Sequence, residues 1–232
     1  MHPRLETPQR PPTAIHSKFA YAILPIVIIA TMAFARRAWT ADPSQGITAA
    51  AALQQLLDGN KLYVADKNVR PDERPSDAAQ HPKAVILSCS DSRVTPAIIF
   101  DQGVGSLFVV RTAGNTYGKL ALESMEYAVA HLHSRLIMVL GHDQCGAVKA
   151  AVAEYPKPTK SVMIRNIYPA VAKTKAMPGD AVSNAISENA VLIADRLAHE
   201  PEFAPLVASG ELKIVPARYH LGDGDVTVLP AN

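Results

Sequence analysis

Three observations predict an α/β fold with a mostly parallel β-sheet flanked by helices. Apolar segments at residues 84–87 and 136–140 are typical of strands buried in a parallel sheet, and the apolar segment at residues 107–110 is a further expected strand. Segments with helical periodicity separate and follow them, so the order is β-α-β-α-β-α. Each strand also ends in a polar segment, and sites in parallel sheets lie at the carboxyl ends of the strands.

Composition excludes several classes of protein. The chain of 232 residues is 48% hydrophobic and 19% charged, which is ordinary for a globular protein with a sizeable core. The net charge is only +2, and no dense Lys/Arg stripe with interleaved aromatics occurs. We therefore expect no nucleic-acid partner. Two cysteines are too few for a disulfide framework, although one bridge is possible.

The amino terminus has the composition of a leader. Residues 1–18 are polar and proline-rich with basic side chains, whereas residues 19–35 (Phe19 to Ala35) are apolar and uncharged. We expect an export signal, with a cleavage pattern at residues 33–35 and a looser one at residues 38–40, that directs the protein to the periplasm. An uncleaved inner-membrane anchor is the alternative, and a buried helix is disfavoured because the segment has no polar face. The predicted parts are therefore a leader at 1–41 and a folded domain at 42–232.

The folded domain begins with a helix in this prediction. Residues 49–57 combine helical periodicity with a cap from Ser44 or Thr48. Residues 59–60, a Gly-Asn pair, are expected to interrupt the helix before a second turn over residues 61–66.

The remaining elements alternate along the chain. We expect further helices at residues 96–101, 118–133, 162–175 and 181–199, and another that begins near Gln144. Strand-like segments are expected at residues 212–215, 219–221 and 226–229, with a hairpin turn at 222–225 that makes an antiparallel edge. The Gly/Asp run of this turn is a poor calcium loop, because no further carboxylates follow at ligand spacing.

Both cysteines directly follow predicted buried strands. Cys89 lies in Cys-Ser-Asp-Ser-Arg, and His142 and Cys145 lie in His-Asp-Gln-Cys. Two thiolates and an imidazole suit zinc, and a catalytic zinc site keeps a fourth position open. Asp91 can take that position or hold a zinc-bound hydroxide by a hydrogen bond, and Arg93 can keep Asp91 ionised. Buried apolar cysteines, a disulfide and a structural zinc are the alternatives.

In these motifs the sequence resembles the β-class carbonic anhydrases, over roughly residues 48–229. The resemblance implies one Zn²⁺ per subunit on Cys89, His142 and Cys145, with Asp91 as a ligand or catalytic residue beside Arg93. It also implies reversible hydration of carbon dioxide to bicarbonate and a proton by zinc-bound hydroxide. Ile86 stands where the family's bicarbonate-inhibited members carry a tryptophan, so we expect no such inhibition.

The resemblance also implies a substrate pocket and an oligomer. Gln80 matches a substrate-binding glutamine, Phe108 and Tyr127 match pocket residues that come partly from a neighbouring subunit, and Ala113 and Gly114 lie in the loop that frames the site. A homodimer or a dimer of dimers is expected.

Two rival functions remain open from the sequence. The same scaffold can hydrolyse carbonyl sulfide or carbon disulfide. The chain can also be a non-catalytic exported binding protein in which Cys89 and Cys145 form a disulfide.

Overall fold

The computed structural model of the protein describes residues 47–67 and 80–231, which belong to one compact unit. The predicted leader at 1–41 lies outside the described residues, as does most of the predicted loop between residues 68 and 82. No helix within 47–67 or 80–231 is long and apolar enough to cross a membrane.

The predicted sheet is confirmed. In the described part of the chain it has five strands in the order β2-β1-β3-β4-β5, with parallel pairing from β2 to β4 and an antiparallel β4–β5 edge. The strands are β1 (Ala84–Cys89), β2 (Leu107–Thr112), β3 (Leu136–His142), β4 (Lys213–Tyr219) and β5 (Val226–Val228). Every residue of β1 and β3 is buried, which agrees with their unbroken apolar sequences.

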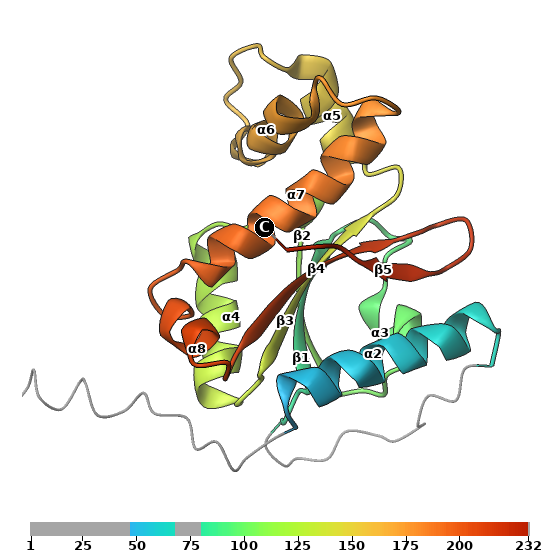
Figure 1. Ribbon diagram of the computed structural model, residues 1–232, viewed down its shortest axis with the longest axis vertical. Coiled ribbons are helices and arrows are strands. Elements are labelled where there is room, and N and C mark those ends of the chain that lie inside the picture. Colours follow the sequence, from blue (N-terminus) through green and yellow to red (C-terminus); the bar gives the residue numbers. More distant parts are fainter. Residues whose placement is uncertain (1–46, 68–79, 232) are drawn as a thin grey trace, which may run out of the picture. The chain divides into compact units, whose positions relative to one another are not determined.

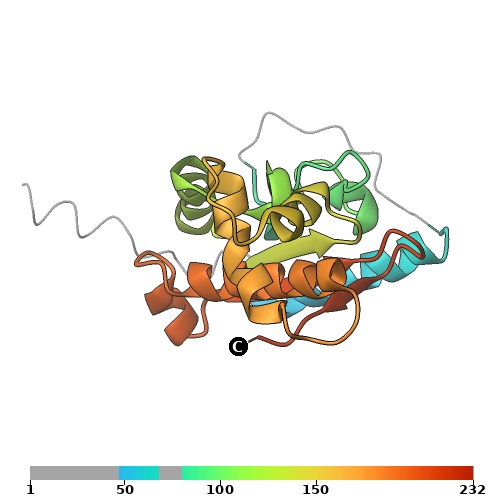
Figure 2. The ribbon, with the colours of Figure 1, turned by 90° about the horizontal axis from the view of Figure 1, so that it is seen from above.

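Helices cover both faces of the sheet and its carboxyl end (Figures 1 and 2). They are α2 (Ala49–Val64), α3 (Pro96–Ile99), α4 (Lys119–His131), α5 (Gly146–Glu154), α6 (Val162–Thr174), α7 (Ala181–Ala198), α8 (Ala204–Ala208) and the 3₁₀ turn η1 (Ala113–Asn115). Helices α2 and α3 pack on one face, and α4, α7 and α8 pack on the other. Helices α5 and α6 and the start of α7 form a third cluster around both cysteines.

The predicted interruption of the first helix is wrong, because α2 runs unbroken through Gly59 and Asn60. Thr48 caps it, as one of the two predicted caps. A Cβ atom on Gly59 would lie 1.9 Å from the carbonyl oxygen of Phe100, so glycine allows the helix to approach α3. The buried Asn60 amide donates to the carbonyls of Ile99 and Gly224 and accepts from the amide of Val226. Both residues serve tertiary packing and do not break the helix.

The predicted break between residues 215 and 219 is also wrong, since β4 is continuous through Pro216. The carbonyl of Pro216 points outward and accepts from the amide of Leu229. Its nitrogen faces the same side, so the missing N–H costs the β3–β4 ladder no hydrogen bond. The short helix α8 was not among the predicted elements, and the other predicted elements appear with ends shifted by a few residues.

Replacing Asn60 should therefore destabilise the fold. Asn60→Ala leaves three buried backbone groups without their partner, and we expect a loss of about 2–4 kcal/mol in the free energy of unfolding. Urea denaturation measures it. Gln54→Ala, which removes only an exposed hydrogen bond to Asp58 on the same helix, serves as control and should cost about 0.5 kcal/mol or less. Equal losses in the two variants would contradict this role.

Candidate metal centre

The carboxyl ends of two neighbouring strands bring the three predicted ligands together. Strands β1 and β3 are parallel neighbours, β1 ends at Cys89 and β3 ends at His142. Cys145 follows three residues later at the amino end of α5. The ligand atoms of the three residues all lie within 4.8 Å of one another, and the side chains are 6%, 0% and 1% exposed.

The imidazole of His142 has the hydrogen-bonding pattern of a metal ligand. Its Nδ1 donates to the carbonyl oxygen of Asp143 at 2.9 Å, which leaves the lone pair on Nε2. That Nε2 atom is buried and has no hydrogen-bond partner. A buried polar atom without a partner costs free energy, and a metal ion would satisfy it.

Both cysteines are free thiols, so the structure contains no Cys89–Cys145 disulfide. The contact between the two sulfurs lowers the pKa of Cys89 and raises that of Cys145. The backbone amide of Gly114 also donates to Cys89 Sγ at 3.3 Å and favours the thiolate. A thiolate is the form that binds a metal.

The cluster fits zinc. A tetrahedral site with bonds of about 2.0–2.3 Å places its ligand atoms roughly 3.5–3.8 Å apart, so the 4.8 Å limit requires only small movements. Two sulfurs and one nitrogen are a donor set that zinc accepts in catalytic sites. The three protein ligands leave a fourth position for a water molecule or substrate.

Asp91 lies beside this cluster and is held by Arg93. The guanidinium donates to both carboxylate oxygens, from Nε at 2.9 Å and from a terminal nitrogen at 2.7 Å. These hydrogen bonds hold the pKa of Asp91 well below its ordinary value, so the carboxylate is ionised. One oxygen, Oδ2, lies 4.0 Å from His142 Nε2. Asp91 is therefore next to the metal cluster but outside the mutually close set of Cys89, His142 and Cys145.

The loop after β2 supports the first cysteine. Arg111 donates to the carbonyl oxygens of Cys89 at 3.2 Å and Asp91 at 2.6 Å, which fixes the backbone of the Cys-Ser-Asp turn. Gly114 adopts a φ of 70°, and a Cβ atom there would lie 2.9 Å from Ile167. Glycine is thus needed for the amide that faces Cys89. Ala113, the other framing residue predicted, is exposed.

The other predicted pocket residues do not join the cluster within one chain. Phe108 pairs with Val85 near the beginning of β2, four residues before Thr112, which pairs with Cys89. Four strand residues span about 13 Å. Tyr127 lies on α4 beside Phe108, with ring centroids 6.5 Å apart, and is 48% exposed. Gln80 is exposed as well.

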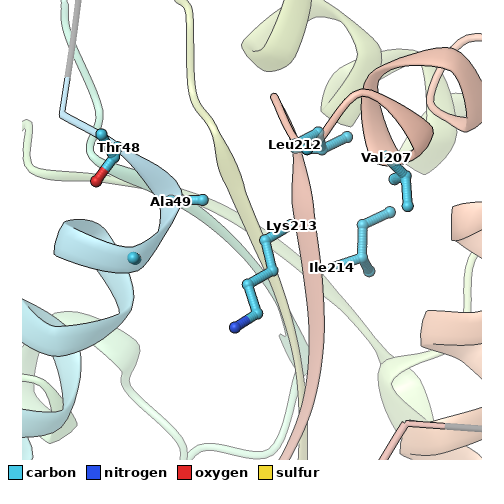
Figure 3. Close-up of a pocket in the computed structure, with 8 residues that line it drawn as sticks. Thr48, Ala49, Val207, Leu212, Lys213 and Ile214 are labelled. Atoms are coloured by element: carbon cyan, nitrogen blue, oxygen red, sulfur yellow. The ribbon is translucent and has the colours of Figure 1, made fainter.

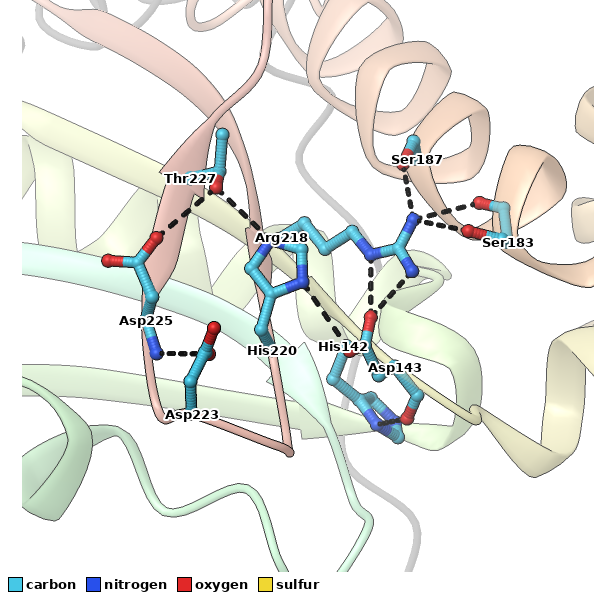
Figure 4. Close-up of polar contacts among 9 residues, drawn as sticks. All are labelled: His142, Asp143, Ser183, Ser187, Arg218, His220, Asp223, Asp225 and Thr227. Atoms are coloured by element: carbon cyan, nitrogen blue, oxygen red, sulfur yellow. Dashed lines mark hydrogen bonds and ion pairs between the residues drawn. The ribbon is translucent and has the colours of Figure 1, made fainter. Parts of the chain in front are cut away.

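A set of supporting residues beyond the predicted ones surrounds the β3–α5 turn (Figure 4). Asp143, between the two ligands of that turn, forms an ion pair with Arg218 on β4, and Arg218 also contacts Ser183 and Ser187 on α7. Only the β3–β4 register, in which Gly141 pairs with Arg218, brings the pair together.

A pocket of about 420 Å³ lies elsewhere (Figure 3). It is lined by the beginning of α2, by Val207 and Gly210, and by Leu212, Lys213 and Ile214 at the beginning of β4. Because the metal cluster lies at the opposite, carboxyl ends of the strands, this pocket is separate from it.

Comparisons with known proteins agree with this site. The family model described as carbonic anhydrase matches residues 84–226. A carbonic anhydrase of Mycolicibacterium smegmatis is 38% identical over 187 residues, 76% of this chain and 91% of that protein. Carbonic anhydrase 2 of Mycobacterium tuberculosis is 40% identical over 188 residues, 75% and 89% of the two chains. The structure of the β-carbonic anhydrase CcaA is 27% identical, with a TM-score of 0.57 over 65% of this chain and 74% of that one.

The Asp91–Arg93 pair predicts a pH effect. Because the folded state lowers the pKa of Asp91, the ionised carboxylate contributes stability above its ordinary pKa, and this is lost as the pH falls through the lowered value. In Arg93→Gln the pKa of Asp91 should rise toward its ordinary value of about 3.9. A ¹³C NMR titration of the metal-free protein measures it, with Arg165→Gln as an exposed-arginine control. An unchanged Asp91 midpoint in Arg93→Gln would refute the assignment.

Proposed function

The chain belongs to the β-class carbonic anhydrase family, and from that premise we propose that it is a zinc enzyme that reversibly hydrates carbon dioxide to bicarbonate and a proton. The observation that carries the proposal is the buried cluster of Cys89, His142 and Cys145 beside an ionised Asp91. A buried Cys₂His set of this kind is suited to hold one zinc ion in each subunit.

The zinc ion would supply the nucleophile, and residues of the chain would hold the ion. A zinc ion, when bound, lowers the pKa of a water molecule that it holds to about 7 and so supplies a nucleophile at neutral pH. Cys89 and Cys145 contribute two thiolates, and His142 contributes a neutral imidazole whose orientation the Asp143 carbonyl fixes.

Asp91 orients the nucleophile. An ionised carboxylate accepts hydrogen bonds but donates none. Asp91 therefore accepts a hydrogen bond from the O–H of the attacking water, and this orients a lone pair of that oxygen toward the carbon of carbon dioxide. Arg93 holds this carboxylate in place with two parallel hydrogen bonds. The resemblance assigns Gln80 a hydrogen bond to the oxygen of the forming bicarbonate, which stabilises the transition state.

The pocket requires a second subunit in this proposal. Phe108 lies about 13 Å along the sheet from the Cys89 end of its own chain, and Tyr127 on α4 beside it is half exposed. In a homodimer, or a dimer of dimers, these rings line the partner's site. Light scattering after size-exclusion chromatography tests this, and a monomeric active protein would contradict it.

We extend the proposal to location. The apolar residues 19–35 direct export to the periplasm or anchor the chain in the inner membrane. Amino-terminal sequencing of protein from fractionated cells separates the two. A start near residue 36 or 41 supports cleavage, an intact Met1 in membranes supports an anchor, and recovery from the cytoplasm alone contradicts export.

Stopped-flow assays test the activity. We expect the purified protein to hydrate carbon dioxide, to lose that activity when zinc is removed, and to regain it when zinc is restored. Carbonyl sulfide and carbon disulfide are assayed in parallel. Hydrolysis of either without hydration of carbon dioxide would replace the proposed reaction, and the absence of all three activities in zinc-loaded protein would refute catalysis.

Asp91→Asn should retain zinc and lose most activity. The amide keeps the size of the side chain but not its charge, and we expect kcat for carbon dioxide hydration to fall by about 10²–10⁴. Zinc content is measured on the same samples. Near-normal turnover by the zinc-loaded variant would remove Asp91 from the catalytic residues.

A further inference from the structure

The turn that carries His142 and Cys145 is anchored by an ion pair. Oδ1 of Asp143 accepts a hydrogen bond from Nε of Arg218 at 2.7 Å and lies 2.6 Å from a terminal nitrogen of the same guanidinium. The other terminal nitrogen of Arg218 donates to the carbonyl and hydroxyl oxygens of Ser183 at 3.1 and 2.9 Å, and to the hydroxyl of Ser187 at 3.0 Å (Figure 4). All three guanidinium nitrogens therefore have partners.

This pair is well suited to fix a position. The side chains of Arg218 and Asp143 are only 15% and 24% exposed, so water screens them less than a surface pair. Two nitrogens of the planar guanidinium contact Oδ1 of Asp143, and a rigid group held in this way cannot swing as a lysine can. Arg218 lies on β4 and its serine partners lie on α7, so Asp143 is held by two elements outside the turn.

Asp143 is also held through its backbone. Its amide donates to the carbonyl of Tyr219 at 3.0 Å, and its carbonyl accepts from Nδ1 of His142 at 2.9 Å. The next residue, Gln144, has a φ of 57°, a conformation that non-glycine residues adopt at a cost. The backbone between His142 and Cys145 therefore contains a residue in an unfavourable conformation, and contacts from other elements stabilise it.

We propose that Asp143 and Arg218 are positioning residues for the metal. By fixing the turn on both sides of Asp143, they hold the His142 imidazole and the Cys145 sulfur where one ion can bind both. The inference rests on the proposed function in one respect, namely that this cluster binds zinc. Removing the pair should raise the dissociation constant for zinc while it leaves the melting temperature of the metal-free protein near that of the wild type.

The test compares zinc affinity among variants of the full chain. Competition with a fluorescent chelator gives the dissociation constant for Arg218→Gln and Asp143→Asn, and we expect zinc to bind about 10–100-fold more weakly than in the wild type. Arg218→Lys keeps the positive charge but not the planar guanidinium, so its zinc affinity should lie between those of the wild type and Arg218→Gln. Cobalt substitution adds a second readout, because the visible absorption of bound Co²⁺ should change in both variants.

Arg196→Gln is the matched control. Arg196 also makes a tertiary contact, since its guanidinium lies 4.3 Å from the ring centre of Tyr117. It is on α7, away from the turn. This variant should lower the melting temperature without changing zinc affinity or the cobalt spectrum. Ser187→Ala, which removes one acceptor, provides a milder variant if Arg218→Gln does not fold, and should weaken zinc binding in the same direction by a smaller factor.

The outcomes separate the two proposals. A wild-type protein that binds neither zinc nor cobalt would overturn the proposed function. A second outcome is that the wild type binds zinc and the variants of Asp143 and of Arg218 or Ser187 bind it with dissociation constants within twofold of the wild type. If their cobalt spectra are also unchanged, the positioning role alone is overturned. Weaker binding with a metal-free melting temperature near that of the wild type would support it.

Discussion

Adjacent pairing of β1 and β3 is the constraint on which the site depends. The two strands are parallel neighbours, so Cys89 at the end of one and His142 at the end of the other reach the same edge of the sheet. The strand order places β2 and β3 on opposite sides of β1, and such a point of reversal is where open α/β sheets carry their sites. A slip of one residue in either strand would turn a ligand toward the wrong face.

Two arginine–aspartate pairs flank this edge and have different consequences. Arg93 holds Asp91 from within the same turn, and the carboxylate remains available beside the cluster. Arg218 holds Asp143 from another strand, and the same guanidinium contacts α7. The first pair orients a group for chemistry, whereas the second orients the backbone that carries two ligands. The first pair gains from its bidentate geometry, whereas the second gains from its partial burial.

Local patterns in the sequence were enough to predict the sheet, its parallel order and the three ligands, because unbroken apolar strands and the Cys-x-Asp-x-Arg and His-x-x-Cys spacings are local signals. The errors arose where tertiary contacts overrule local preference. Gly59 and Asn60 look like a helix break but allow close packing and bind three distant backbone groups. Pro216 sits inside β4 because its nitrogen faces away from β3, on the side where its carbonyl accepts from the amide of Leu229. Arg218 could not be linked to Asp143, 75 residues away, without the β3–β4 register.

The most direct test of the central claim is X-ray absorption at the zinc edge of the purified, metal-loaded protein. We expect the zinc ion to have two sulfur neighbours at about 2.3 Å and one imidazole nitrogen at about 2.0–2.1 Å, with one further light atom. In Cys89→Ser one sulfur should be lost from that shell. A spectrum without sulfur neighbours, or one that Cys89→Ser leaves unchanged, would contradict the claim that the ends of β1 and β3 form the metal site.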